Sequence, residues 1–263
     1  MNATLITGTR RQPINGAGIA VVCGVALLFV QAYIVVEAKP QDVFTGFGHI
    51  VDIVTRGVPP DVGSMQNALW GALVTLDVAI LGTLGSIIVS LPLALLAAEN
   101  TRPGRFAYFV SRGIIGVART IPDVVWALIF VTAVGLGPFA ATLGLAVHSV
   151  GVLAKLYAEG IEDVAMAPVH ALTVLGANRL QVATQAVIPT VLPTLIGLTL
   201  YRLDTNVRSS LVLGFVGGGG LGLQIESALN LFQYRQLTML LLVMGVLIVG
   251  VEAVSVYLRR RIH

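Results

Sequence analysis

The sequence contains apolar runs that are long enough to cross a lipid bilayer. Residues 17–36 and 124–154 carry no charge, and residues 68–98 are charged only at Asp77. A helix needs about 20 predominantly apolar residues to span the hydrocarbon layer. The chain is 56% hydrophobic and 11% charged, whereas soluble domains average about 45–50% and about 25%. These values exclude a water-soluble globular domain and predict an integral membrane protein.

A glycine- and proline-rich tetrapeptide divides the longest uncharged run. Gly135, Gly137 and Pro138 favour a turn, so we expect two helices joined by a tight hairpin. Residues 17–36 exceed the apolar core of a signal peptide, about 7–15 residues, and we expect that helix to be retained. The sequence therefore predicts an all-α polytopic membrane protein. The six expected transmembrane helices occupy residues 17–36, 68–98, 113–134, 139–157, 192–216 and 237–258.

Arginines concentrate on one side of this six-helix path. Cytoplasmic loops carry an excess of Lys and Arg, so that side and both termini are expected in the cytoplasm. Residues 1–37 are then the cytoplasmic N-terminus and first helix, residues 38–67 an extracytoplasmic loop, and residues 68–263 the core domain. The arginines on the cytoplasmic side are Arg10, Arg11, Arg102, Arg105, Arg112, Arg179, Arg259, Arg260 and Arg261.

The cytoplasmic stretch that ends near Pro189 is expected to form a helix–glycine–helix elbow. Pro168 suits the first turn of a helix, and Gly176 suits a helix end with positive φ. Asn178 can cap a second short helix, which Pro189 is expected to stop. Such an elbow would protrude toward a protein partner. The alternative is an ordinary amphipathic loop between two transmembrane helices.

The spacing of this elbow resembles the EAA loop of ABC-importer permeases. That pattern is Glu-Ala-Ala, three residues, Gly, nine residues, and Ile-x-Leu-Pro. With Gly176 aligned, Ala171 matches the middle alanine, and Ile188 falls at the Leu position. The resemblance implies that residues 164–190 form the coupling loop, which seats in a groove of an ATPase. The residues it assigns to ATPase coupling are His170, Ala171, Leu172, Gly176, Ala177, Asn178, Arg179, Ile188 and Pro189.

Longer strings resemble the phosphonate-type branch of the ABC-importer permeases, also called binding-protein-dependent transport inner-membrane components. They follow the family order from about residue 68 to the C-terminus. The resemblance implies the type I ABC-importer permease architecture with a cytoplasmic coupling loop. The strings that carry it are residues 119–128, 135–139, 154–162, 175–182, 200–209 and 212–222.

The same resemblance implies partners, a location and a cargo. It implies a homodimer, or a pair with a related permease, in the inner membrane of a prokaryote. Two cytosolic ABC ATPase subunits would dock on this pair, and an extracytoplasmic phosphonate-type binding protein would deliver substrate. The implied cargo is phosphonate or a related phosphorus oxyanion. ATP and Mg would be held by the partner ATPase, and we expect no cofactor on this chain.

Missing motifs argue against enzymatic activity of the chain itself. A phosphate-binding Walker A loop needs Lys after Gly, but the two lysines, Lys39 and Lys155, both follow alanine. The sequence has neither a Gly-x-Ser-x-Gly nor a His-Glu-x-x-His motif. Its single cysteine, Cys23, excludes an internal disulfide or a multi-cysteine metal site. The net charge of +3 is scattered, so we expect membrane lipid and no nucleic acid as a partner.

Charged residues within the expected helices mark a candidate translocation pathway, because ionisable groups in a bilayer usually face a bundle interior or a water-filled cavity. Asp204 and Arg208 are spaced i, i+4, as are Arg119 and Asp123, so one interpretation is structural ion pairs. The other is that Arg208, together with Arg202, guides an anion. The candidate pathway residues are Arg202, Asp204, Asn206, Arg208, Arg119 and Asp123.

Other polar features have simpler expected roles. We expect Lys155 and Glu159 to pair near the inner interface, His148 to hydrogen-bond a neighbouring helix, and Glu252 to pair with a terminal arginine. The glycine-rich loop at residues 217–222 is expected to be a close-packed turn. The alternative for that loop is a nest of backbone N–H groups that faces an anion.

Three rival functions stay open from the sequence. A self-sufficient secondary transporter or channel would move solute without an ATPase, and an inverted repeat would support it. An ABC permease for a different small solute would share the whole architecture. An intramembrane enzyme or scaffold would need a catalytic constellation, and the sequence offers none.

Overall fold

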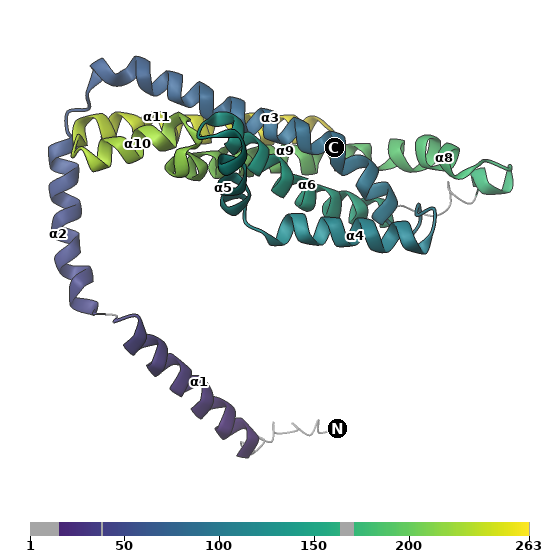
Figure 1. Cartoon of the computed structure of the whole chain (residues 1–263), viewed down its shortest axis with the longest axis horizontal. Helices are drawn as coiled ribbons and strands as arrows, with labels where there is room; N and C mark the ends of the chain where they lie inside the picture. Colours follow the sequence, from purple (N-terminus) through teal and green to yellow (C-terminus); the bar gives the residue numbers. More distant parts are fainter. Residues whose placement is uncertain (1–15, 38, 164–170, 263) are drawn as a thin grey trace, which may run out of the picture. The chain divides into compact units, whose positions relative to one another are not determined.

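The computed structural model describes residues 16–37, 39–163 and 171–262, and these ranges are helical without a β-strand (Figure 1). The chain forms two compact units, residues 1–53 and 54–263. Helix α1 (Gly16–Val35) lies in the first unit, and α2 (Pro40–Gly57) starts there. Helix α2 carries Asp42 in its first turn and Arg56 in its last, and both charges complement the helix dipole. A helix thus occupies much of the stretch that we expected to be a loop.

The second unit is a bundle in which long helices alternate with short connecting turns. The all-α fold class is confirmed for the described residues, and the expected helices lie within a few residues of their predicted limits, with one exception described below. The elements are η1 (Val62–Ser64), α3 (Met65–Ala97), α4 (Arg105–Thr120), α5 (Asp123–Val134), α6 (Pro138–Glu162), α8 (Arg179–Val182), η2 (Ala183–Val187), α9 (Ile188–Leu213), η3 (Gly214–Gly218), α10 (Gly220–Asn230) and α11 (Tyr234–Ile262).

Helix α6 is the centre of this bundle and packs against α3, α4, α5 and α9. Two glycines seven residues apart share one face of α6. A Cβ atom at Gly144 would collide with the backbone of Ala127 in α5, and one at Gly151 with the backbone of Arg119 in α4. Small residues let membrane helices approach closely, so these two positions set the spacing of α4 and α5 against α6.

The expected continuous helix over residues 113–134 is wrong. It is two helices, α4 and α5, which meet at an angle of 90°. Ile121 is extended, with φ −79° and ψ 123°, because the ring of Pro122 disfavours helical backbone in the preceding residue. The indole Nε1 of Trp126 donates a 3.1 Å hydrogen bond to the carbonyl of Ala118, which satisfies one of the carbonyl groups freed by the break.

The predicted hairpin between the fourth and third expected helices is confirmed. Helix α5 ends at Val134, and α6 begins at Pro138, which suits the first turn of a helix. Gly135 and Gly137 have φ of 89° and 143°, a region that glycine adopts without strain. The turn chemistry of this tetrapeptide therefore decides where the uncharged run folds back.

The structure allows four to six membrane crossings, and the six expected from the sequence are the upper value. Four of the described helical segments are long and apolar enough to cross a membrane singly. Two bent pairs raise the number to as many as six, if each pair crosses once: α4 with α5, and residues 180–186 with 188–218. The chain is therefore a polytopic membrane protein.

Candidate functional site

The elbow that precedes α9 is described from Ala171 onward. Residues 171–174 form one helical turn, and Gly176 ends it with φ 83°. The amide of Ala177 donates to the carbonyl of Leu172 at 3.1 Å, and the Gly176 amide donates to the carbonyl of Thr173 at 3.0 Å. These bonds satisfy carbonyl groups at the helix end. The predicted glycine stop is therefore confirmed, whereas Pro168 and His170 lie outside the described residues.

The second arm of the elbow starts with a reciprocal cap. The Oδ1 of Asn178 accepts a 2.9 Å bond from the amide of Gln181, and the Oε1 of Gln181 accepts a 2.8 Å bond from the amide of Asn178. This arrangement is a capping box. Arg179 is the first residue of α8, and the predicted cap at Asn178 is confirmed.

The predicted helix stop at Pro189 is wrong. The chain continues from α8 through the π-helical turn η2 into α9, which Ile188 begins. Pro189 falls in the first turn of α9, where a proline costs no intrahelical hydrogen bond. The direction of the chain changes by 63° between residues 180–186 and 188–218. The elbow is therefore joined to α9 through a helical bend.

Some apolar side chains of the elbow pack against the bundle, and others are exposed. Leu172 and Val182 pack against a core cluster that contains Leu153, Tyr157 and Val191. Three other apolar side chains of the elbow have no cover within the described residues. Their exposed fractions are 87% for Val174, 81% for Leu175 and 72% for Leu180. An exposed apolar patch of this kind marks an interaction site.

A buried polar network joins α9 to α3 and α6 in the interior of the bundle. Asn206 is fully buried, and its Nδ2 donates to Thr83 Oγ1 at 2.9 Å. Ser149 Oγ donates to Asn206 Oδ1 at 3.1 Å and accepts from Arg202 Nε at 3.0 Å. Arg202 is buried, and its Nη2 has no hydrogen-bond partner in the described part of the chain. Three helices are thus bridged by side chains whose sequence separations exceed 50 residues.

The second arginine of α9 has a different environment. Arg208 Nη2 lies 3.2 Å from Asp204 Oδ2 and 3.3 Å from Glu252 Oε2 in α11. The expected pair of Asp204 with Arg208 is present. Glu252 pairs with Arg208 rather than with a terminal arginine, because α9 and α11 pack side by side. Two carboxylates therefore surround the exposed guanidinium of Arg208.

The break at Pro122 separates the residues of the expected pair Arg119–Asp123. No ion pair joins them in the described structure, since they belong to different helices that meet at a right angle. Asp123 is instead the first residue of α5, and its Oδ1 accepts a 2.9 Å bond from the adjacent Val124 amide. Its carboxylate interacts electrostatically with Arg202 and with His148. The sequence interpretation of a pair at i, i+4 is therefore wrong, and Asp123 interacts electrostatically with Arg202.

His148 makes the expected bond to a neighbouring helix. Its Nδ1 lies 3.0 Å from the carbonyl oxygen of Ile121, the residue at the break between α4 and α5. The ring is therefore next to a carbonyl group that the helix break leaves free.

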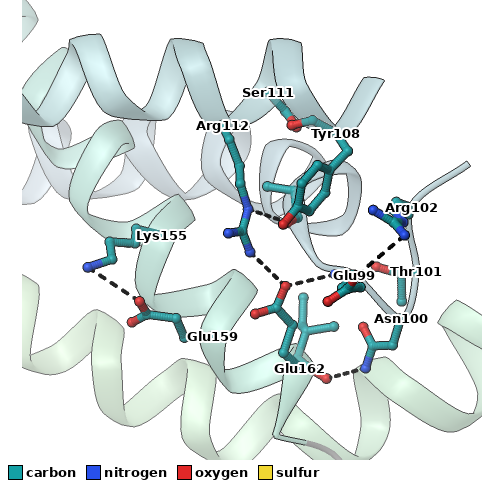
Figure 2. Close-up of polar contacts among 12 residues, drawn as sticks. Glu99, Asn100, Thr101, Arg102, Tyr108, Ser111, Arg112, Lys155, Glu159 and Glu162 are labelled. Carbon is teal, nitrogen blue, oxygen red and sulfur yellow. Dashed lines mark hydrogen bonds and ion pairs between the residues drawn. The ribbon is translucent and has the colours of Figure 1, made fainter. Parts of the chain in front are cut away.

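A charged cluster at the end of α6 was missed by the sequence analysis (Figure 2). Arg112 Nη2 lies 2.8 Å from Glu162 Oε1, which also accepts a 2.8 Å bond from the amide of Glu99. The ring of Tyr108 lies under the guanidinium groups of Arg102 and Arg112, at 4.9 and 4.5 Å. Arg112 and Glu162 are 50 residues apart, whereas the Lys155–Glu159 pair, which was expected from its i, i+4 spacing, is present at 3.3 Å.

The glycine-rich loop supports the close-packing interpretation. A Cβ atom at Gly220 would collide with Thr75 Oγ1, and one at Gly222 with the backbone of Leu211. The amide of Leu221 donates to Thr75 Oγ1 at 2.9 Å. These contacts hold α10 against α3 and α9, and no group of metal-ligating side chains occurs there or elsewhere in the described ranges.

Comparisons with known proteins define the class. Residues 90–263 match the family described as the binding-protein-dependent transport system inner membrane component. The chain belongs to this family, and it is therefore an inner-membrane permease component of a transporter that works with a binding protein.

Relatives within the family are named for the transport of phosphite or phosphate. The chain is 35% identical to the phosphite transport system permease protein PtxC of Stutzerimonas stutzeri, over 92% of this chain and 87% of the relative. It is 37% identical to the phosphate-import permease protein PhnE of Mycolicibacterium smegmatis, over 86% of this chain and 42% of that protein. The expected resemblance to phosphonate-type permeases is confirmed.

The fold matches a solved ABC importer. A chain of the MetNI methionine ABC transporter, solved in inward-facing conformations, aligns with a TM-score of 0.68 and 20% identity. The match covers 77% of this chain and 99% of the MetNI chain. The architecture is therefore that of ABC-importer permeases.

Proposed function

We propose that this chain is the permease subunit through which an ABC importer carries phosphonate, phosphite or phosphate across the inner membrane. The observation that supports the cargo most strongly is the 35% identity to PtxC over nearly the whole of both chains. Separate ATPase subunits supply the energy and hold ATP and Mg. The chain itself is a transport subunit rather than an enzyme and binds no cofactor of its own.

The proposed assembly contains two permease chains, two cytosolic ATPases and an extracytoplasmic phosphonate-type binding protein. Both termini and residues 164–190 lie in the cytoplasm, and residues 38–67 lie outside. The exposed apolar side of the elbow, Val174, Leu175 and Leu180, is the proposed seat of the ATPase. The bent but helical junction to α9 lets a displacement of the elbow move a membrane-spanning helix, because packed helices shift as rigid elements.

The docking part of this proposal is tested by capture of the ATPase. The assembled complex is purified in mild detergent, with tagged Leu175→Asp permease in place of the wild type. We expect ATPase recovery to fall at least tenfold, because a carboxylate would replace an apolar contact. The matched control is Leu231→Asp, at an equally apolar residue that is 64% exposed after α10. Equal ATPase recovery with both variants would contradict the proposed seat.

The transport part is tested in proteoliposomes that hold the permease, the ATPase and the binding protein. We expect ATP-dependent uptake of labelled phosphite, phosphate or methylphosphonate. Uptake by the permease chain alone would instead establish a secondary transporter. If the complex took up a different solute and none of these three, the proposed cargo would be wrong, but the ABC-importer architecture would stand.

The proposed pathway runs along the polar residues of α9 and the break between α4 and α5. Arg202 and Asp123 support it, because they interact electrostatically and Arg202 is buried in the bundle. Asn206 fixes Arg202 through Ser149, and Asp204 holds Arg208. We expect Arg202→Gln and Arg208→Gln to slow uptake several-fold in fully assembled complexes. An assembled Arg208→Gln complex with wild-type uptake would exclude Arg208 as a guide for the anion.

A further inference from the structure

A small cavity lies where α3 ends beside α4 and α6. Its volume is about 200 Å³, and a single water needs about 10–15 Å³ by the same measure. The cavity therefore has room for a small tetrahedral anion with water. Its polar lining comes from three cations, Arg112, Arg119 and Lys155, and two carboxylates, Glu159 and Glu162.

The charges in this cavity do not cancel. Glu162 pairs with Arg112 at 2.8 Å, and Glu159 pairs with Lys155 at 3.3 Å (Figure 2). Arg119 makes no ion pair within the described ranges of the chain. Arg112 and Arg119 are seven residues apart on α4, which places them on one face of the helix, two turns apart. The cavity thus holds one more cation than it holds carboxylates.

Arg119 is exposed and lies at the end of an apolar helical segment. It lies in the last turn of α4, which together with α5 is apolar enough to form one membrane crossing. A charge at membrane depth usually pairs with an opposite charge or with a polar group. The apolar side of the same helix, including Phe109, Ile114 and Val117, is exposed elsewhere. Two cations of α4, Arg112 and Arg119, therefore line the cavity, and a bound anion would neutralise the excess positive charge.

Gly116 keeps the cavity open between the two arginines. A Cβ atom at this position would meet nothing within 4 Å, although the residue lines the cavity. Its backbone is helical, so a larger side chain can be accommodated in α4 without strain. This position offers a way to fill the cavity without changing any charge.

We propose that this cavity is a binding site for a phosphate-type oxyanion, held by Arg119 with Arg112 and Lys155. Guanidinium groups suit such anions because they donate several hydrogen bonds in a fixed plane. Two sources supply this chemistry. One is the free anion in transit toward the cytoplasm, which rests on the proposed function, and the other is the headgroup of an anionic lipid.

The test uses the permease–ATPase complex in nanodiscs, without nucleotide or binding protein. In nanodiscs of phosphatidylcholine alone, equilibrium binding of radiolabelled inorganic phosphate is measured. In nanodiscs that also contain phosphatidylglycerol, native mass spectrometry counts the phosphatidylglycerol molecules that stay bound to each permease chain. Neither readout depends on transport, so a failure of the proposed function would appear only in the uptake assay.

Three variants and one control are compared. We expect Arg119→Gln and Gly116→Leu to weaken binding about tenfold, since one charged contact or the space itself is lost. We expect Glu159→Gln to strengthen it, because a repelling carboxylate is neutralised. The control is Arg105→Gln, the same charge change on the same helix at an exposed residue that does not line the cavity.

The two arms distinguish the sources. If phosphate binding weakens with Arg119→Gln and Gly116→Leu and strengthens with Glu159→Gln, the site binds the free anion. If only the number of retained phosphatidylglycerol molecules changes, the site binds a lipid headgroup. Both results support an oxyanion site. The proposal is overturned if neither ligand binds, or if Arg105→Gln weakens binding as much as Arg119→Gln does.

Discussion

The two arginines of α9 show how one helix holds the same side chain in two environments. Arg202 is buried, donates to Ser149 and belongs to a hydrogen-bonded network with Asn206. Arg208 is exposed and lies between the carboxylates of Asp204 and Glu252. Hydrogen bonds between side chains of three helices stabilise the first environment. Ion pairs at the surface of the bundle stabilise the second. The two sides of α9 should therefore respond differently to mutation, to salt and to loss of a single partner.

The largest effect is expected for Asn206→Leu. This change removes both hydrogen bonds of the amide. Thr83 keeps its bond to the Ala79 carbonyl and Ser149 keeps its bond from Arg202, but the buried Ser149 hydroxyl loses its acceptor. Unsatisfied buried groups cost about 1–3 kcal/mol, which corresponds to a fall in the unfolding midpoint of roughly 2–10 °C. The midpoint is measured by size-exclusion chromatography after heating in detergent. Thr205→Ala, next to Asn206 on α9, is the control, and an equal fall there would contradict a special role for the network.

A smaller effect is expected for Ser149→Ala. The hydroxyl donates to Asn206 and accepts from Arg202, but its removal deletes little volume. Hydrogen bonds inside membrane bundles average about 0.6 kcal/mol, so we expect a loss of about 1 kcal/mol for the two bonds. A double-mutant cycle with Asn206→Leu should show strong non-additivity. Additive losses would mean that the two side chains act independently.

The smallest effect is expected on the exposed side of α9. A double-mutant cycle of Arg208→Gln with Glu252→Gln should give a coupling free energy of about 0.2–1 kcal/mol. High salt should reduce that value, because surface charges are screened within a Debye length, while the Ser149–Asn206 coupling should stay unchanged. A salt-independent coupling for Arg208 and Glu252 would place this pair in an environment as dry as that of Arg202.

Local chemistry accounts for the parts of the fold that the sequence predicted. Residues 135–138 favour a turn because of their glycines and proline, and the structure turns there. Gly176 and Asn178 carry the chemistry of a helix end and a helix cap, and both occur as expected. The Asp204–Arg208 and Lys155–Glu159 pairs follow from helical spacing alone. Each of these features depends on residues within one or two turns of each other.

The errors arose where local rules compete. Pro122 and Pro189 both have the chemistry of a helix stop, but only Pro122 interrupts a helix. Pro189 lies in the first turn of α9, where its missing N–H group is not needed. The expected pair Arg119–Asp123 is absent because Pro122 breaks the helix between the two residues, whereas the i, i+4 rule assumes an unbroken helix.

The sequence by itself determined that the chain is an all-α membrane protein, roughly where its helices lie, and to which family it is similar. These properties follow from apolar run length, turn residues and ordered motifs, all of which can be seen along the chain. Only the tertiary structure decided that Asp123 interacts electrostatically with Arg202, that Glu252 pairs with Arg208, and that Arg112, Arg119 and Lys155 line one cavity. Those contacts join residues on different helices, and the glycines of α6 set how closely the helices approach. No periodicity within a single helix encodes that distance.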